Sequence, residues 1–341
     1  MADAVQHRWL DRVWYRGALS GVWLIPFGWI FGALAALRRA LYRSGMLPSF
    51  AVRVPVVVVG NLTAGGTGKT PLVIWLVDEL ARRGFRPGVV TRGYGGTIRQ
   101  PTIVTPSMAA ADCGDEPLLI AARTHRTVVV ARDRVAGARL VAECGADVVI
   151  CDDGLQHYRL RRSCEVVVID GERRFGNGRL LPAGPLREPL SRLAAVDLIA
   201  VNGGPARAGE LPMRLVSGRA RNLTSGEERS LESFTGATVH AVAAIGNPQR
   251  FFDGLRRQGL RPIEHAFSDH YALRAADLDF REPAAVLMTE KDAVKCRDFA
   301  REGWWAIPVS AHFEPPAAEA FMARVLARVR EPLDNLSSRG A

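Results

Sequence analysis

The pattern of hydrophobic and polar positions changes near residue 54, where short apolar runs begin to alternate with amphipathic stretches. The run at 54–59, VPVVVV, has no polar position, which is typical of a parallel strand that is covered on both faces. We predict strands at 54–59, 87–91, 127–131, 147–151, 165–169 and 197–201, and helices at 70–83 and 133–144. This alternation predicts an α/β fold with a doubly wound, mostly parallel sheet.

A second α/β stretch begins near residue 237. It contains apolar runs at 238–245, 285–289 and 305–309 that predict strands, and periodic stretches at 248–259 and 316–330 that predict helices. Residues 203–236 are rich in Gly, Arg and Ser and have weaker periodicity, so they are a candidate link between two lobes. We therefore predict three regions: an N-terminal segment at 1–45, a core domain at 46–225 and a smaller C-terminal α/β lobe at 226–341.

Residues 17–37 form an uncharged, largely apolar run with arginines on both sides. A helix of this length is about 31 Å long, enough to cross the hydrocarbon core of a bilayer, although Pro26 would kink it. Three interpretations remain open: a spanning helix, an anchor in one leaflet, or a buried hairpin packed on the soluble domain. We favour a membrane-associated segment, because the flanking arginines suit an anionic lipid surface.

The charge distribution supports this interpretation. The formal net charge of the 341-residue chain is +10, which favours an anionic partner. Residues 1–53 hold seven Arg and two Asp, so half of the excess charge brackets the apolar run. A nucleic-acid-binding protein would carry basic residues interleaved with aromatic ones along one face, whereas here the clustered charge flanks an apolar anchor, so we expect no nucleic-acid partner. The five cysteines lack CxxC spacing and predict neither a disulfide framework nor a zinc site.

A glycine-rich segment, GNLTAGGTGKT at 60–70, lies between the first predicted strand and the first predicted helix. Gly68, Lys69 and Thr70 fit the phosphate-loop pattern, while Thr63 occupies the position where glycine is usual. The backbone N–H groups of such a loop bind phosphate, Lys69 would neutralise the β- and γ-phosphates of ATP, and Thr70 would bind Mg²⁺. The predicted nucleotide-binding residues are Thr63, Ala64, Gly65, Gly66, Thr67, Gly68, Lys69 and Thr70.

Two acidic residues, Asp152 and Asp153, follow the predicted strand at 147–151. A phosphate-loop enzyme needs a carboxylate at the end of a nearby strand to hold Mg²⁺, so we expect at least one of them to bind the metal. Gln156 and His157 follow shortly afterwards and should lie at the same edge of the sheet, where ligands bind.

Other candidate residues have two interpretations each. Asp115 could accept a proton from an attacking hydroxyl, but Asp115 and Glu116 also suit the start of a helix, and the residues alone favour the helix. His270, in FSDHYAL, is more often structural than catalytic when taken alone. Lys291 and Lys295 share one helix face, which could equally be an ordinary solvated helix start.

Two loops rich in glycine or proline carry arginines that could bind phosphate oxygens. TRGYGG at 91–96 contains Arg92, and RLLPAGPLREP at 179–189 contains Arg179 and Arg187. Either loop could equally be a solvated turn, and the pattern does not decide between the two.

Seven segments together resemble one family. They are GNLTAGGTGKTP, TRGYGG, GDEP, DDGLQH, DGERRFGNGRLLPAGPLREP, FSDHY and TEKDAVK, in the order found in the tetraacyldisaccharide 4′-kinases. The resemblance covers nearly the whole chain. It implies transfer of the γ-phosphate of ATP to the 4′-hydroxyl of a tetraacylated glucosamine disaccharide 1-phosphate, which forms lipid IVA in lipid A biosynthesis. It also implies Mg²⁺ and a location at the cytoplasmic face of the bacterial inner membrane.

The resemblance further implies a fold and specific residue roles. The fold would be a P-loop NTPase-like core with a smaller C-terminal α/β lobe, joined by a two-stranded linker. Asp115 would be the general base and His270 its partner, with Lys69 also catalytic. The implied metal-site residues are Thr70, Asp152, Asp153 and Glu116, and Gln156 and His157 would lie close by.

Two other classes remain as alternatives. A GTPase-like switch protein predicts an Asn/Thr-Lys-x-Asp segment after a strand; IAVNGG at 199–204 lacks it, and TEKD at 289–292 is the nearest candidate. A nucleic-acid-binding ATPase would account for the positive charge. Competition between ATP and GTP tests the first alternative, and salt-sensitive binding to DNA tests the second.

Overall fold

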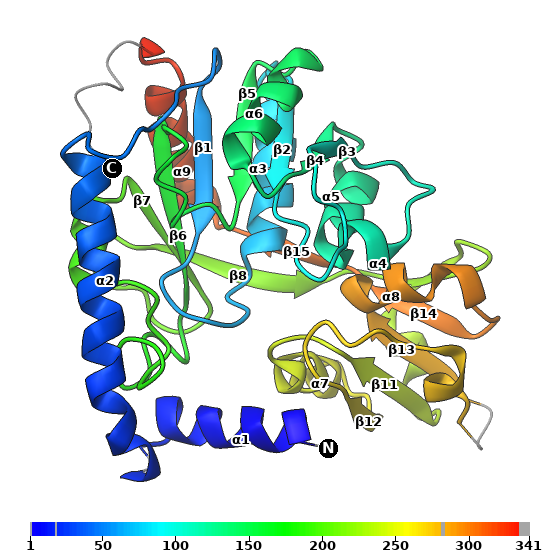
Figure 1. Ribbon diagram of the computed structural model, residues 1–341. Helices are drawn as coiled ribbons and strands as arrows, with labels where there is room; N and C mark the ends of the chain where they lie inside the picture. Colours follow the sequence, from blue (N-terminus) through cyan, green and yellow to red (C-terminus); the bar gives the residue numbers. More distant parts are fainter. Residues whose placement is uncertain (1, 18, 281–283, 334–341) are drawn as a thin grey trace.

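The computed structural model describes residues 2–17, 19–280 and 284–333, and the structural statements below concern that part of the chain. Two α/β units are present, one built on a nine-stranded sheet and the other on a six-stranded sheet (Figure 1). Of the N-terminal helices, α2 (Ile25–Arg43) lies along one side of the larger unit, whereas α1 (Ala2–Tyr15) runs across from its lower end toward the smaller unit (Figure 1). This arrangement confirms the predicted fold class.

The larger sheet contains all six strands predicted before residue 202. Its strands are β1 (Val56–Gly60), β2 (Pro87–Thr91), β3 (Thr102–Ile103), β4 (Val128–Val130), β5 (Val148–Asp152), β6 (Cys164–Asp170), β7 (Leu198–Asn202), β8 (Leu211–Ser217) and β15 (Val309–His312). Their order is β15-β8-β7-β6-β1-β5-β2-β4-β3. All neighbouring pairs are parallel except the two at the edges, β3 with β4 and β15 with β8.

Helices cover both faces of this sheet. They are α3 (Lys69–Arg82), α4 (Ala110–Cys113), α5 (Asp115–Thr124), α6 (Arg134–Glu143), the 3₁₀-helix η2 (Leu190–Ala195) and α9 (Pro315–Val329). Since successive residues of a strand face opposite sides, Val57 and Val59 join the core under α3, α5 and α9. Val56 and Val58 join the core under α6. The uninterrupted valine run therefore reflects a strand that is buried on both faces.

The smaller unit has the sheet order β10-β9-β14-β13-β11-β12. Its elements are β9 (Ala220–Asn222), β10 (Glu228–Arg229), η3 (Leu231–Phe234), β11 (Val239–Ala243), α7 (Pro248–Arg257), β12 (Ile263–Ala266), η4 (Ala275–Leu278), β13 (Ala285–Thr289), α8 (Glu290–Cys296), η5 (Arg297–Phe299) and β14 (Trp304–Ile307). The sequence did not predict β12 or the short strands between 203 and 236.

The units divide the chain differently from the predicted regions. β9 already belongs to the smaller sheet, although it lies before residue 226. The chain then returns to the larger sheet through β15, and α9 packs against β1, β6 and β8. The last lobe predicted at 226–341 therefore includes two elements that belong to the larger unit. The strands that connect the units, β8 and β15, pair antiparallel with each other, with Val309 opposite Ser217.

The N-terminal apolar run does not form one continuous helix with a kink at Pro26. It is divided between a 3₁₀-helix, η1 (Leu19–Leu24), and α2 (Ile25–Arg43), and α1 (Ala2–Tyr15) precedes both. Pro26 lies in the first turn of α2, where its missing N–H breaks no hydrogen bond and causes no kink. Helix α2 also continues past residue 37 because its last turns, rich in Leu, Ala and Arg, remain good helix formers.

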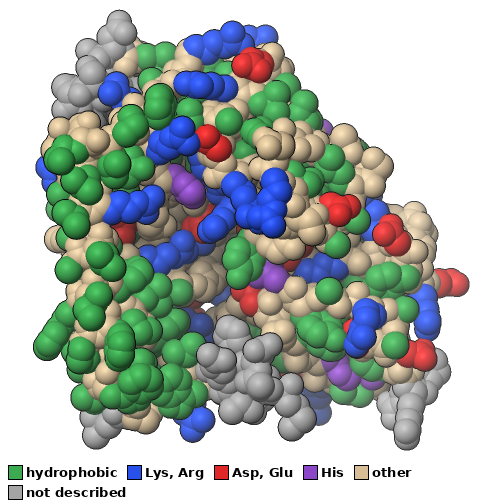
Figure 2. Space-filling model, in the orientation of Figure 1, with side chains coloured by type: hydrophobic (Ala, Val, Ile, Leu, Met, Phe, Trp, Pro, Cys, Tyr) green, Lys and Arg blue, Asp and Glu red, His purple; other side chains and the backbone are tan. Residues whose placement is uncertain are grey.

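Most of this apolar run is exposed, which contradicts the buried-hairpin interpretation. Trp23, Phe27, Trp29, Ile30 and Leu34 are each more than half exposed. Hydrophobic side chains accordingly gather along the edge of the molecule that α2 forms (Figure 2). In the described chain, Ser20–Arg43 is the one helical stretch that is long and apolar enough to cross a membrane; its most apolar 18 residues have a mean hydropathy of 1.7, and 17% of them are buried.

The smaller sheet contains a pair of hydrogen-bonded histidines, His240 and His265. His240 Nδ1 lies 3.0 Å from His265 Nε2, and Phe280 stacks on both rings with centroid distances of 4.1 Å. A hydrogen bond between two imidazoles requires that one of them remain neutral. Burial, and then the neighbouring His240, lower the pKa of His265 below its ordinary value.

We therefore expect the protein to lose stability as the pH falls from about 7 to 5. A histidine whose pKa is depressed in the folded state stabilises the fold fully above the unfolded pKa of about 6.5, and that contribution is lost as the pH decreases. Thermal unfolding midpoints measured across this range should fall for the wild type and fall less for His265→Gln. An equal decrease of the unfolding midpoint in the wild type and in His265→Gln would show that this pair does not cause the pH dependence.

Candidate active site

The glycine-rich loop occupies the position that the sequence predicts, between the end of β1 and the start of α3. Gly65 and Gly68 have φ angles of 106° and 95°, which side-chain-bearing residues rarely adopt. A Cβ at Gly68 would also lie 2.6 Å from Nδ2 of Asn202, which donates to the Thr67 carbonyl at 3.0 Å. The loop is thus held against the end of β7 in a conformation that requires glycine.

Both acids of the predicted pair lie next to this loop, because β5 is the neighbour of β1 and places Asp152 opposite Val59. The carboxylate of Asp153 is 3.5 Å from Lys69 Nζ and 3.2 Å from an Arg187 nitrogen. Burial would raise the pKa of Asp153, but the charges of Lys69 and Arg187 outweigh burial and hold that pKa well below its usual range. Asp153 is therefore an ionised partner of the loop lysine.

Asp152 has a different environment. Its side chain is almost fully buried, and within the described residues its Oδ1 atom has no hydrogen-bond partner. Burial first, and then the negative charge of Glu116, raise the pKa of Asp152 to about 7, although Lys69 opposes this shift. A buried carboxylate oxygen without a partner is costly unless a ligand satisfies it.

The site fits a magnesium ion of the kind that nucleotides bring with them. The described residues contain no group of three or more His, Cys, Asp or Glu side chains that could hold a metal ion. Mg²⁺ does not need such a group, because it usually takes one or two protein oxygens and completes its shell with water and phosphate. The unsatisfied oxygen of Asp152, beside the phosphate loop, is suited to this role.

Asp115 and His270 form a pair that joins the two units. Asp115 begins α5 of the larger unit and is 4% exposed, and its Oδ2 lies 3.2 Å from Nδ1 of His270. His270 has a left-handed φ of 58°, and its ring lies 4.7 Å from that of Tyr94. Asp115 does begin a helix, as its residue type favours, but the fold also brings it together with the histidine that only the resemblance had connected to it.

Two lysines of α8 surround this pair. Lys295 Nζ is 3.5 Å and Lys291 Nζ is 3.9 Å from Oδ2 of Asp115, and Lys291 is also 3.1 Å from Glu116. Burial would raise the pKa of Asp115, but the His270 hydrogen bond and the lysine charges lower it to about 2. Sequence reasoning assigned these lysines no role, although their shared helix face was the available signal.

Among the candidate arginines, Arg187 is the one that reaches the site. Its guanidinium donates to Asp153, to Gln156 and to the Thr63 carbonyl, and it also pairs with Asn61. The loop at 179–189 is therefore ordered against the phosphate loop at this residue. Arg92 and Arg179 are exposed, which leaves their interpretation as solvated turn residues open.

A third contact between the units, which the sequence did not predict, involves Arg250 of α7. Its guanidinium donates to Asp170 at 3.3 Å and to Asn202 at 3.2 Å, at the ends of β6 and β7. Asn202 is the residue that binds the Thr67 carbonyl, so Arg250 connects the smaller unit to the phosphate loop through one side chain.

These features define a class of protein. A phosphate loop with its lysine, a strand-end carboxylate suited to Mg²⁺ and a second carboxylate paired with histidine are the parts of a P-loop kinase. The family model described as tetraacyldisaccharide-1-P 4′-kinase matches residues 20–327, and the chain belongs to this family. The resemblance drawn from the sequence motifs is thereby confirmed.

Related proteins agree with this assignment. A tetraacyldisaccharide 4′-kinase from Methylobacillus flagellatus is 49% identical over 323 residues, which cover 93% of this chain and 96% of the relative. The one from Vibrio cholerae is 44% identical over 340 residues, covering 97% and 99%. The crystal structure of LpxK from Aquifex aeolicus in complex with ATP is similar with a TM-score of 0.77 and 28% identity, covering 91% of this chain and 99% of that one.

Proposed function

We propose that this chain transfers the γ-phosphoryl group of ATP to the 4′-hydroxyl of a tetraacylated glucosamine disaccharide 1-phosphate, which forms lipid IVA for lipid A biosynthesis. One observation supports the proposal: the smaller unit approaches the phosphate loop through Gly246, beside the residue that precedes His270. A Cβ at Gly246 would lie 3.2 Å from both the Gly66 nitrogen and the carboxylate of Asp269, the residue before His270. The proton-accepting pair and the phosphate site are therefore neighbours.

The residues around the phosphate site have separate tasks in this proposal. The loop amides and Lys69 bind and neutralise the ATP phosphates, and Arg187 holds Asp153 against the lysine. Mg²⁺, when bound at Asp152 and Thr70, supplies further neutralisation of the charge on the β- and γ-phosphates.

Asp115 accepts the hydrogen of the attacking hydroxyl and orients its oxygen toward the γ-phosphate. Its low pKa makes it a weak base that is always ionised near neutral pH. A weak base is sufficient, because the transition state of phosphoryl transfer is loose and the attacking oxygen carries little charge until late. His270, Lys291 and Lys295 keep this buried carboxylate ionised and in place.

We further propose that the protein works at a membrane surface, the cytoplasmic face of the bacterial inner membrane, and needs no nucleic acid. A tetraacylated substrate remains in the bilayer, so the enzyme has to reach it there. Helix α2 packs its glycines on the loop that carries Arg187: a Cβ at Gly32 would lie 2.6 Å from Leu180, and one at Gly28 would lie 3.1 Å from the Leu180 carbonyl. The aromatic side of α2 is left facing outward for lipid.

Labelled ATP and the disaccharide 1-phosphate lipid test the proposed function. We expect the purified protein to transfer label to the lipid in a Mg²⁺-dependent reaction that unlabelled ATP, but not GTP, competes out. Hydrolysis of ATP without labelled lipid would refute the kinase assignment, and effective competition by GTP would revive the GTPase-like alternative.

The membrane proposal predicts that the exposed residues of α2 hold the protein on lipid. Replacing Trp29, Ile30 and Leu34 with Ser should weaken binding to anionic vesicles by roughly 100-fold or more, since each buried apolar side chain contributes about 1.5–3 kcal/mol. Flotation with vesicles measures the bound fraction, and Val216→Ser, at an exposed apolar residue of β8, is the control. Unchanged flotation of the triple variant would contradict this role of α2.

Arg250 should affect turnover more than nucleotide affinity. In Arg250→Ala, the smaller unit loses its bonds to Asp170 and Asn202, so His270 spends less time next to Asp115. The phosphate loop itself remains intact. We expect kcat to fall about tenfold, since hydrogen bonds to charged groups contribute roughly 1.5–3 kcal/mol, with KM for ATP changed little. Arg256→Ala is the control, because Arg256 pairs with Asp253 and Glu264 inside the smaller unit. A rise in KM alone would contradict this expectation.

A further inference from the structure

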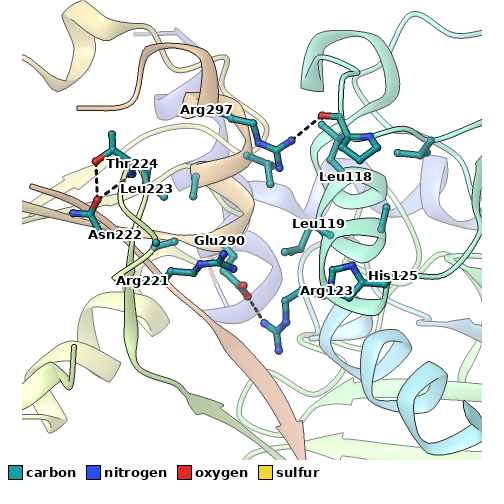
Figure 3. Close-up of a pocket in the computed structure, with 18 of the residues that line it drawn as sticks. Leu118, Leu119, Arg123, His125, Arg221, Asn222, Leu223, Thr224, Glu290 and Arg297 are labelled. Atoms are coloured by element: carbon teal, nitrogen blue, oxygen red, sulfur yellow. Dashed lines mark hydrogen bonds and ion pairs between the residues drawn. The ribbon is translucent and has the colours of Figure 1, made fainter. Parts of the chain in front are cut away.

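A second cavity, of about 890 Å³, lies between the two units and away from the phosphate loop (Figure 3). Helix α5 of the larger unit forms one wall, and α8 together with the turn after β9 forms the other. Asp115 lies at the first residue of α5, whereas Arg123 in the cavity lies about 12 Å further along the same helix. The cavity is large enough for a drug-sized molecule.

The cavity carries a clear excess of positive charge. Four arginines line it, Arg123, Arg126, Arg221 and Arg297, against one carboxylate, Glu290. That carboxylate is already bound by Arg123 at 2.6 Å and by the Val309 backbone N–H at 3.3 Å.

The other three arginines are available to a ligand. Arg297 donates to the Pro106 carbonyl at 2.9 Å, a neutral partner that does not cancel its charge. Across the described parts of the chain, no carboxylate lies in ion-pair contact with Arg126, Arg221 or Arg297, although Arg221 acts at longer range on Glu290 and Arg126 on Asp78. Three guanidinium groups around one space favour a dianion over a single carboxylate.

The rest of the cavity is lined by apolar side chains. Leu118 is buried and Leu119 half-buried on α5, and Val294 on α8 and Leu223 after β9 complete an apolar surface. In Figure 3 the two leucines lie on α5 opposite the strand and turn that carry Arg221 and Leu223. A ligand that fits both parts has an apolar body and an anionic group.

We propose that this cavity is a binding site for a soluble organic phosphate, a phosphate monoester with an apolar body. A phosphate monoester carries close to two negative charges at neutral pH and matches the three arginines that lack carboxylate partners. A soluble molecule is the better occupant than a bilayer lipid, because α5 and α8 lie on the opposite side of the molecule from α2 (Figure 1). The site is separate from the phosphate loop and does not depend on the proposed kinase reaction.

Calorimetric titration with phenyl phosphate tests the proposal. The full-length protein in detergent is first saturated with a non-hydrolysable ATP analogue and Mg²⁺, so that the phosphate loop is occupied. We expect Arg221→Ala and Arg297→Ala each to weaken binding about tenfold, since each removes a hydrogen bond to a charged group. Inorganic phosphate, which lacks the apolar body, should bind at least tenfold more weakly than phenyl phosphate.

A second kind of variant tests the cavity while all four arginines are kept. Ala122 is exposed on α5 and lines the cavity, and glutamate is a good helix former, so Ala122→Glu should fold normally and abolish binding by adding a competing carboxylate. Arg261→Ala, at an exposed arginine outside the cavity, should bind as the wild type does. The proposal is overturned if the wild type does not bind phenyl phosphate, or if Ala122→Glu and Arg221→Ala bind it normally.

Discussion

Replacing Asp115 with Ala will abolish phosphoryl transfer while ATP still binds. General-base catalysis contributes about 10²–10⁴-fold, and the variant also removes the acceptor that orients the attacking hydroxyl, so kcat should fall by at least about 10³-fold. ATP affinity should remain within about twofold, since Asp115 contacts His270 and the two lysines but none of the loop residues that hold the nucleotide. Steady-state transfer to the lipid and equilibrium binding of a fluorescent ATP analogue measure the two quantities.

Two further variants separate the charge of Asp115 from its structural contribution. Asp115→Asn keeps the size of the side chain and should lose nearly as much activity as alanine, because an amide does not accept the proton. Asp112→Ala changes an exposed carboxylate three residues earlier and should leave turnover unchanged. Near-normal turnover in Asp115→Asn would refute the assignment of Asp115 as the base.

Replacing Lys69 with Ala will affect nucleotide handling itself. Lys69 is the lysine of the loop itself, and its removal leaves Asp153 paired with Arg187 alone. We expect ATP affinity to fall at least tenfold and kcat to fall by about 10²–10³-fold, the range found when one preorganised charge-stabilising group is removed. Nucleotide binding and phosphoryl transfer are measured as for Asp115.

The matched control for this variant is Arg82→Ala, in the last turn of the same helix. Arg82 pairs with Glu79 and is largely exposed, far from the loop, so the substitution should change neither quantity. If Lys69→Ala bound ATP with wild-type affinity, the loop would not be the site that binds the ATP phosphates. The kinase proposal would then be refuted.

Features that depend on neighbouring residues could be predicted from the sequence. The valine run of β1, the glycines of the loop and the acids after β5 follow local rules of strand burial, positive φ and strand-end position. The expected kink at Pro26 was wrong for a local reason as well: proline is tolerated in the first turn of a helix, so Pro26 begins α2 and does not kink a longer helix.

Features that depend on distant contacts could not be predicted from local patterns. The return of β15 and α9 to the larger sheet follows from antiparallel pairing with β8, which no local pattern indicates. Asp115 and His270 are 155 positions apart, and the residues alone favoured a helix start for the first and a structural role for the second. Their pairing was implied only by the family resemblance, and the distance between them follows from how the two units pack.

The sequence by itself determined the α/β fold, the phosphate-binding loop and the presence of an N-terminal apolar segment, because periodicity, glycine and charge act over a few residues. The tertiary structure alone decided which polar and charged groups come together: Lys291 and Lys295 with Asp115, Arg250 with Asn202, and four arginines around one cavity. The physical reason is that electrostatic interactions depend on distance in space and on burial, and both are set by how the two units pack.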